Sequence, residues 1–161
     1  MAGRVHTTKI RVRYAECDSM QFVHHAKFVE YFELGRTDWI RCMARSYGDL
    51  EKEGILLPVV HFQIRFHIPA RYDQELTIET SVKRVTKLQI DFGNRVVDAS
   101  GQKVHCEGEV GLACINREGR PQRIPAELLE PLTHWLDAAA TQPTGSNAGS
   151  AASHHRERAR R

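Results

Sequence analysis

Two hydrophobic periodicities divide the chain into one helical segment and several extended ones. Between about residues 25 and 46, apolar side chains recur at steps of three and four, the spacing of one buried helical face. This face contains Phe28, Phe32, Gly35, Trp39 and Met43. From residue 57 to 68 the period changes to two, which is typical of a strand with one apolar face. The pattern predicts one long helix packed against a sheet.

Further alternating segments predict a sheet of about five strands. The expected strands cover residues 9–14, 57–68, 76–87, 88–99 and 103–116. Tight turns join the later strands, and short connections favour antiparallel neighbours. A short helical turn over 49–53 should end at Gly54, and a last helix should run from Pro125 to about residue 137. The fold class is therefore α+β, an antiparallel sheet around one long central helix.

Two further predictions about packing follow from Gly35 and from the strand over 57–68. Glycine in mid-helix costs roughly 1 kcal/mol, so we expect another backbone to pass close to Gly35. Alternate residues of the strand should form one apolar face. They are Val60, Phe62, Ile64, Phe66 and Ile68.

A single sheet would have exposed edges, and pairing with a second copy would cover one of them, so we expect a dimer at least.

Composition and charge indicate one folded domain over residues 1–138 and a flexible basic tail over 139–161. The tail is rich in alanine, glycine and serine, with too little apolar surface to become ordered. The net charge of +3 arises largely from the final RERARR, so it does not predict nucleic-acid binding. The chain shows neither a signal-peptide pattern nor an apolar run long enough to span a bilayer, and we expect a cytoplasmic protein.

Cysteine and histidine spacing does not predict a metal site. The four cysteines form no CxxC pair, which suits a reducing compartment. His61, His67 and His105 lack metal-ligand spacing, and no third clustered ligand is evident for zinc.

Asp18 is a lone carboxylate placed just before the long helix. The first amides of a helix lack intrahelical acceptors and that end is partly positive, so a carbonyl oxygen there can be polarised. Asp18 could then attack the carbonyl or activate a water molecule. From spacing alone, a capping role for Asp18 is the more common alternative.

An ordered set of motifs resembles a known family. The set is Tyr14-x-x-x-Asp18, then His25-Ala26, Phe28-x-x-Tyr31-Phe32-Glu33-x-x-Arg36-Thr37, Pro69-Ala70-x-x-Asp73-x-x-Leu76 and Ile124-Pro125. It is similar to the 4-hydroxybenzoyl-CoA thioesterase-like branch of the hot-dog acyl-CoA thioesterases, over about residues 7–130. The resemblance implies a hot-dog fold and a homodimer, often assembled into a homotetramer, with active sites at the dimer interface and no metal or organic cofactor.

The resemblance also implies roles for individual residues. Asp18 matches the catalytic carboxylate, as nucleophile or general base. His25 matches the start of the helix, where its amide would hold the thioester carbonyl and its side chain could position substrate or water. Tyr14 matches a tyrosine that supports the site in one branch of the family. Gln21 and Lys27 depart from the glycine and asparagine that the family often has.

Substrate-binding residues are less defined by the sequence. His24 stands where an aromatic or small apolar residue is common, so it either lines the pocket or faces solvent. The phosphates of CoA call for basic side chains. The best local cluster is Lys83, Arg84 and Lys87, with exposed, functionless charges as the alternative.

The resemblance therefore predicts a thioesterase that hydrolyses acyl-CoA, with acyl carrier protein as another carrier of the acyl group. A hot-dog hydratase or dehydratase is one alternative, and it would need an Asp–His pair placed across the acyl β-carbon. A module that binds acyl-CoA or acyl carrier protein without turnover is the other.

Overall fold

The computed structural model describes residues 4–140, and the side chains of 4–136. The strands are β1 (His6–Arg11), β2 (Val59–Phe66), β3 (Glu75–Val85), β4 (Gln89–Asp98) and β5 (Val104–Ala113). They form one antiparallel sheet in the order β1-β3-β4-β5-β2. The helices are α1 (Lys27–Met43), α2 (Tyr47–Lys52) and α3 (Ala126–Ala140), and η1 (Tyr14–Glu16) is a 3₁₀ turn.

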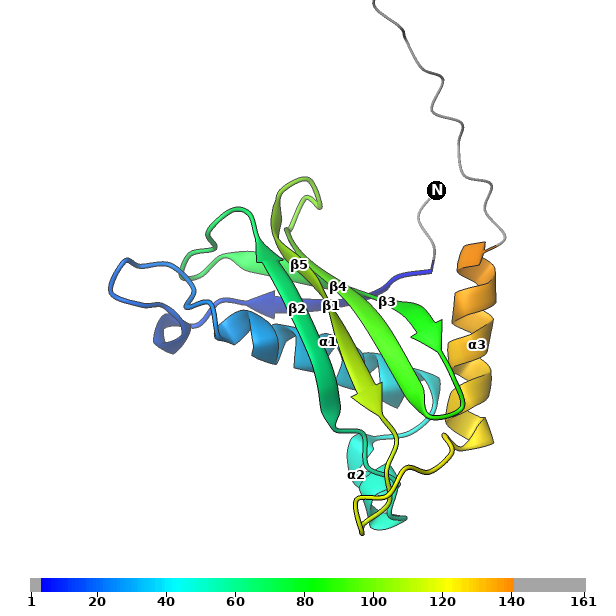
Figure 1. The fold of residues 1–161 in the computed structure, drawn as a ribbon. Coiled ribbons are helices and arrows are strands. Elements are labelled where there is room, and N and C mark those ends of the chain that lie inside the picture. The colour runs from blue at the N-terminus through cyan, green and yellow to red at the C-terminus, as the bar shows by residue number, and fades with distance from the viewer. Residues whose placement is uncertain (1–3, 141–161) are drawn as a thin grey trace, which may run out of the picture.

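The long helix α1 lies across one face of the curved sheet, and α3 packs beside it at the end of β3 (Figure 1). The predicted apolar face of α1 is confirmed, because Phe28, Phe32, Gly35 and Trp39 are buried and Met43 at its end is half-buried. The Trp39 ring contacts Phe92 of β4 and Trp135 of α3, with centroids 5.6 and 5.3 Å apart. Trp39 thus joins the three layers of the core.

Gly35 lies where the helix and the sheet approach most closely. A Cβ atom at this position would stand 2.5 Å from Thr80 Oγ1 and 2.7 Å from Ile78 Cγ2, both on β3. The close approach expected from the sequence is real, but side chains of the sheet cause it rather than a passing backbone. Asn94 donates to Thr80 Oγ1 at 3.0 Å, so the contact includes a buried polar pair.

The apolar face predicted for β2 is only partly buried. Only Phe62 and Ile64 of its apolar face are half-buried, whereas Val60, Phe66 and Ile68 are exposed. The alternation is correct, but β2 is an edge strand, and the ends of its apolar face extend beyond the cover that α1 provides. An apolar edge of this kind is a surface that another chain can cover.

The ends of some helices and strands differ from the predicted ends by a few residues. The first strand is β1 rather than 9–14, because its partner β3 begins at Glu75, opposite Arg11, and the chain then turns into η1. Gly54 ends the α2 segment with a φ of 80°, as expected for a C-cap glycine. The helix α3 includes the first two residues of the expected tail, and 141–161 lie outside the described residues. Among residues 4–140, no helix is long and apolar enough to cross a membrane.

Candidate active site

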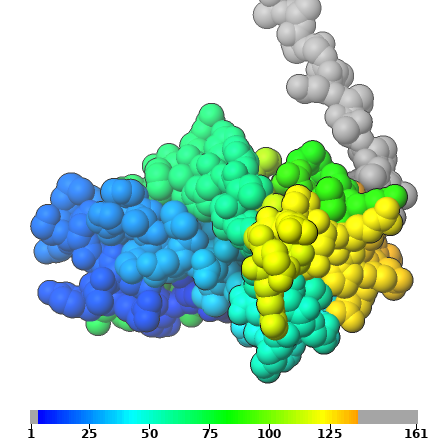
Figure 2. All heavy atoms as spheres, turned by 60° about the horizontal axis from the view of Figure 1, so that its bottom comes forward, coloured from blue at the N-terminus to red at the C-terminus, as the bar shows by residue number. Residues whose placement is uncertain are grey.

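A small antiparallel hairpin carries Asp18 directly into the start of α1. Cys17 pairs with Val23, the Asp18 amide donates to Phe22 O at 2.8 Å, and the His24 amide donates to Glu16 O at 2.9 Å. The hairpin projects from one end of the molecule, at the blue end of the ribbon and of the space-filling surface (Figures 1 and 2). Its second strand continues into His25, so Asp18 and the helix start belong to one local unit.

Asp18 uses one of its two carboxylate oxygens to hold the tip of this hairpin. Its Oδ1 atom accepts from the amides of Met20 at 2.9 Å and Phe22 at 3.4 Å, and Gln21 between them has a φ of 63°. The Oδ2 atom accepts no hydrogen bond from any described residue. Asp18 is half-buried. The capping role is therefore present, and it leaves one oxygen available for chemistry.

The start of α1 leaves one backbone amide without an acceptor. The amides of Lys27, Phe28 and Val29 donate to the carbonyls of His24, His25 and Ala26. The Ala26 amide donates to His24 Nδ1 at 3.2 Å. Within residues 4–140, the His25 amide has no such partner. Of the amides of residues 25–29, that of His25 is consequently the one free to bind a carbonyl oxygen.

The side chains of His24 and His25 are exposed and lie side by side. Their ring centroids are 4.1 Å apart, and the His25 ring also meets Phe66 of β2 edge-on at 6.5 Å. Because His24 Nδ1 accepts from the Ala26 amide, this histidine caps the helix start rather than simply facing solvent. Its role toward substrate remains a prediction.

An ionic network around the buried Glu16 carboxylate fixes the base of the hairpin, and the Arg13 side chain in it is exposed. Glu16 is 4% exposed, and its carboxylate accepts from the Arg13 amide at 2.7 Å, the Arg13 guanidinium at 2.8 Å and the Tyr31 hydroxyl at 2.9 Å. Burial by itself raises the pKa of Glu16, but the hydrogen bonds from Arg13 and Tyr31 outweigh it and hold the pKa below its ordinary value of 4.5. Burial and the bond to Glu16 raise the pKa of Tyr31. The network ties the hairpin to α1 through Tyr31.

Replacing Glu16 by Gln should therefore destabilise the protein, by about 1–3 kcal/mol at pH 7, the range for losing charged hydrogen bonds. Because the pKa of Glu16 is lower in the folded than in the unfolded state, its contribution is present above 4.5 and is lost as the pH falls through the folded value. The difference in unfolding free energy between wild type and variant should shrink below about pH 4.5. Urea denaturation from pH 3 to 7 measures it. Glu130→Gln, on the exposed side of α3, is the control, and parallel pH curves for Glu16→Gln and wild type would contradict the assignment.

Tyr14 lies in the same loop but does not contact Asp18 through a hydrogen bond in the described part of the chain. Tyr14 is 81% exposed, and its ring meets Tyr72 edge-on, with centroids 5.6 Å apart. Tyr72 belongs to the β2–β3 connection, which also places Arg71 over the Phe22 ring at 4.6 Å. The same connection is hydrogen-bonded to the hairpin, because the Val23 amide donates to the carbonyl oxygen of Ala70.

The predicted basic cluster does not meet Asp18 within one chain. Asp18 lies near the Glu75 end of β3, whereas Lys83, Arg84 and Lys87 lie at its other end. Eight or more residues of strand separate the two, roughly 26 Å at the usual rise. Arg84 is also engaged, because its Nε donates to Asp91 at 2.6 Å. Lys83 and Lys87 are exposed.

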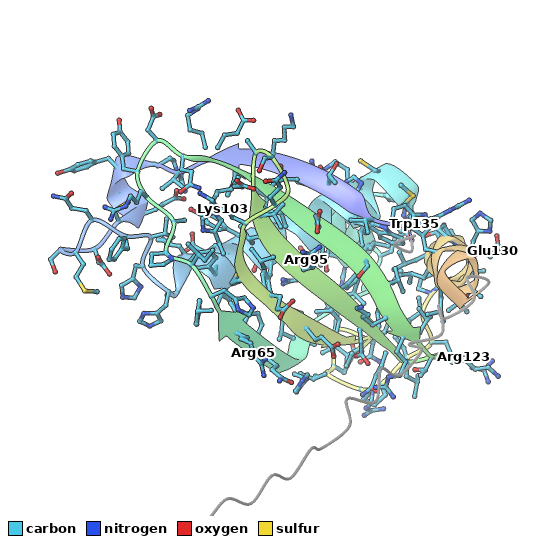
Figure 3. The ribbon with its side chains drawn as sticks, turned by 90° about the horizontal axis from the view of Figure 1, so that it is seen from above. Arg65, Arg95, Lys103, Arg123, Glu130 and Trp135 are labelled. Carbon is cyan, nitrogen blue, oxygen red and sulfur yellow. The ribbon has the colours of Figure 1, made fainter. Side chains whose placement is uncertain are left out.

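A hollow of about 760 Å³ lies on the outer face of the sheet, away from α1. Its charged lining side chains include Arg65, Glu79, Arg95, Glu107 and Glu109. Arg65 and Arg95 are seen over this face in Figure 3. Neither Asp18 nor His25 lines it. The candidate site is thus an open surface at the end of one chain, not an enclosed pocket.

The sequence did not indicate the structural roles of three residues near the candidate site. Glu16 carried no signal beyond its spacing of three from Arg13, which is common among exposed ion pairs. Phe66 was expected on the apolar face of a strand, with no signal that it would stand beside His25. Arg71 carried no structural assignment from the sequence, and its guanidinium stacks on Phe22.

A curved antiparallel sheet around a central helix, with a carboxylate hairpin leading to the helix start, defines a hot-dog protein of the thioesterase type. The chain belongs to the Thioesterase-like superfamily, whose sequence model matches residues 12–132.

Individual relatives agree with this assignment. YneP of Bacillus subtilis is 30% identical over 116 residues, covering 71% of this chain and 83% of YneP. The acyl-CoA thioester hydrolase YbgC of Escherichia coli O6:H1 is 27% identical over 121 residues, covering 74% of this chain and 90% of YbgC. The crystal structure of a DHNA-CoA thioesterase from Staphylococcus aureus superposes with a TM-score of 0.71 at 27% identity, over 84% of this chain and 89% of that one. The predicted family and fold are confirmed.

Proposed function

We propose that this protein is an acyl-CoA thioesterase that hydrolyses a thioester to a free acid and CoA. The observation that carries the proposal is that one hairpin–helix unit carries both a free carboxylate oxygen, Asp18 Oδ2, and an unengaged amide, that of His25. Membership in a thioesterase-like family and the resemblance to YbgC support the substrate class. Four free cysteines suit work in the reducing cytoplasm.

In the proposed reaction the thioester carbonyl oxygen binds the His25 amide at the positive end of α1. Negative charge that develops on this oxygen in the transition state is then stabilised by the amide and the helix dipole. Asp18 Oδ2 either attacks the carbonyl carbon or takes a proton from an attacking water molecule. The CoA thiolate leaves as the C–S bond breaks. A nucleophilic Asp18 forms an acyl–aspartyl anhydride as the thiolate leaves, and water must then hydrolyse this anhydride to free the acid. When that water attacks the Asp18 carboxyl carbon, a single turnover in isotopically labelled water labels Asp18 and not the acid, whereas a water molecule activated by Asp18 labels the acid in the first turnover.

The open site suggests that a second copy completes it. Phe66, at the end of β2 next to α1, meets Phe28 and His25 yet is 48% exposed. Antiparallel pairing of two β2 edges would bury this apolar strip and set the Val59 end of the second copy beside it. By the strand register, that end of the sheet also carries Lys83, near the end of β3, and Lys87, in the β3–β4 turn. We propose a homodimer, or a homotetramer built from it, in which Lys83 and Lys87 of each copy face the CoA phosphates of the other copy's site.

Removal of Lys83 and Lys87, which form no ion pair with any described residue, tests this arrangement. The double variant Lys83→Gln/Lys87→Gln should raise KM for an acyl-CoA about tenfold, equivalent to about 1.4 kcal/mol, with kcat within about twofold. The reason is that both charges would act on remote phosphates, equally in ground state and transition state. Lys9→Gln on β1, the opposite edge of the sheet, is the matched control. An unchanged KM in the double variant would show that the two lysines are ordinary surface charges and do not bind CoA.

Release of free thiol from a panel of short, long-chain and aromatic acyl-CoAs, with acyl carrier protein thioesters beside them, tests the activity itself. The proposal requires turnover of at least one substrate. A binding module would instead show a higher melting temperature with acyl-CoA and no thiol release. A hydratase would add water to crotonyl-CoA without releasing thiol.

A further inference from the structure

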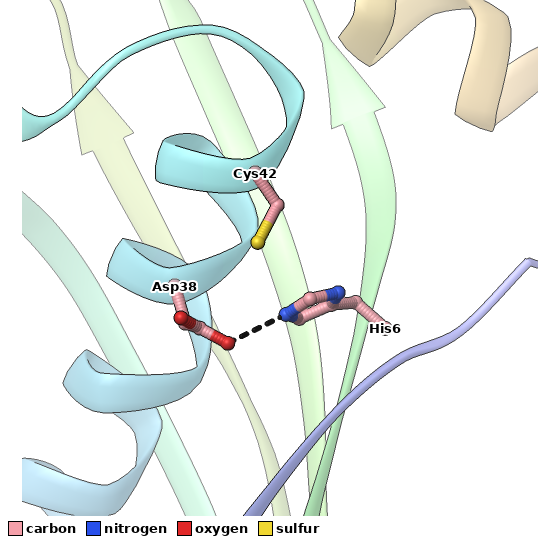
Figure 4. A group of neighbouring side chains, drawn as sticks. All are labelled: His6, Asp38 and Cys42. Atoms are coloured by element: carbon pink, nitrogen blue, oxygen red, sulfur yellow. Dashed lines mark hydrogen bonds and ion pairs between the residues drawn. The ribbon is translucent and has the colours of Figure 1, made fainter.

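Three side chains with metal-binding atoms meet between β1 and the second half of α1, outside the candidate active site. They are His6, Asp38 and Cys42, whose ligand atoms all lie within 4.8 Å of one another (Figure 4). The closest pair is His6 Nε2 and Asp38 Oδ2, at 2.9 Å. In the described part of the chain this is the one group of three or more such side chains.

Local structure explains why these residues meet. Asp38 and Cys42 are four positions apart on α1, so they project from the same face of the helix. His6 belongs to the half-buried set of β1 that alternates with exposed residues, so its ring points from the edge strand toward α1. The backbone of two rigid elements thus sets the spacing of the three groups.

The three ligand types narrow the choice of metal. Imidazole nitrogen, carboxylate oxygen and thiolate sulfur together are a set that Zn²⁺ accepts, whereas Mg²⁺ and Ca²⁺ require oxygen ligands. We propose that His6, Asp38 and Cys42 form a Zn²⁺ site, in which a water molecule occupies the fourth tetrahedral position. Binding releases the Cys42 thiol proton to solvent.

Only small side-chain movements are needed to form this site. Neighbouring ligand atoms of a tetrahedral zinc are about 3.5 Å apart, given metal–ligand distances of 2.0–2.3 Å. The His6 and Asp38 atoms must separate slightly from 2.9 Å, and the Cys42 sulfur must approach from within 4.8 Å. Cys42 is exposed, so its rotation meets little resistance.

Neighbouring groups orient the Asp38 carboxylate. The Thr8 hydroxyl donates to Oδ2 at 3.0 Å, and Arg41 Nη1 donates to Oδ1 at 3.2 Å. Such outer contacts hold a metal-binding carboxylate in place. The Arg41 charge opposes a cation, but it engages the oxygen remote from His6, and its side chain is 60% exposed. Arg41 can turn to solvent when the metal binds.

The proposed zinc site would stabilise the fold and take no part in catalysis. It ties the edge strand β1 to α1, and its α1 residues lie 13 and 17 positions after His25, roughly 20–25 Å at the helical rise. Zn²⁺ should therefore raise the melting temperature without changing kcat for thioester hydrolysis. At a hundredfold excess over Kd, the expected rise is about 5 °C or more.

Cobalt substitution tests the proposal independently of enzyme activity. The full-length chain, freed of metal with a chelator, is titrated with Co²⁺ and then with Zn²⁺. We expect a thiolate-to-cobalt charge-transfer band together with the visible bands of tetrahedral Co²⁺, both abolished by excess Zn²⁺. Cys42→Ser should remove the charge-transfer band. His6→Gln and Asp38→Asn should each weaken binding at least tenfold.

Matched variants exclude other sources of the signal. Cys17→Ser should retain the band, and so should the double variant His154→Ala/His155→Ala, which removes the two C-terminal histidines. The metal-free Cys42→Ser protein should have the same melting temperature as the metal-free wild type, because Cys42 is exposed. Absence of a charge-transfer band, its persistence in Cys42→Ser, or its loss only in the His154/His155 variant would overturn the proposal.

Discussion

Replacing Asp18 by Asn should lower kcat for thioester hydrolysis by at least about 100-fold, the scale expected for a group that acts in the transition state. Asn keeps the size of Asp, and its side-chain oxygen can still accept from the Met20 and Phe22 amides that hold the hairpin. What the substitution removes is the negative charge on the free oxygen. Thiol release under saturating acyl-CoA measures the effect.

Two variants separate chemistry from hairpin shape. Asp73→Asn changes another loop aspartate near the same end of the sheet, with a φ of 64° that Asn tolerates, and should leave kcat within about twofold. Asp18→Ala removes the capping oxygen as well and should cost a further 1 kcal/mol or so in unfolding free energy. If Asp18→Asn turns over as fast as wild type, Asp18 is only a cap and the proposed mechanism is wrong.

Replacing Trp39 by Ala should lower the free energy of unfolding by about 3–5 kcal/mol, the range for deleting a large buried aromatic side chain. Trp39 is fully buried at the junction of α1, the sheet and α3, and it makes edge-on contacts with Phe92 and Trp135. Partial collapse cannot fill the space because three separate elements border it. Urea denaturation at fixed protein concentration measures the loss, since dimerisation would make stability concentration-dependent.

The matched substitution is Trp39→Phe. The indole Nε1 atom is buried and has no acceptor among the described residues, so the stabilisation comes from packing rather than from a hydrogen bond. Phe retains much of the aromatic volume and removes the unsatisfied donor, and its cost should be less than half that of Ala. Equal losses for the two variants would show that the indole contributes something other than packed volume.

The sequence was sufficient for the fold because periodicity is a local property. The three-and-four spacing of Phe28, Phe32 and Trp39 predicted the buried face of α1, and alternation predicted the strands to within a few residues. Gly35 pointed to a close approach, which Thr80 and Ile78 make. The family motifs placed Asp18 before the helix, and the hairpin into α1 follows directly from that short separation along the chain.

Burial and long-range contacts were decided by the tertiary structure. Alternation shows which side of β2 is apolar, but whether that side is covered depends on strand order, and β2 is the edge strand that leaves Phe66 exposed. Strand direction likewise sets Lys83 and Lys87 at the end of β3 remote from Asp18, although the sequence suggested one shared site.

What the sequence determined about this protein is therefore its elements, its family and the identity of Asp18 and His25 as candidates. Only the tertiary structure showed that Glu16 is buried against Arg13 and Tyr31, and that His6 meets Asp38 and Cys42. The physical reason is that a contact between residues more than 30 positions apart, such as His6 and Asp38, depends on how an edge strand lies against a helix. No pattern within either segment encodes that placement.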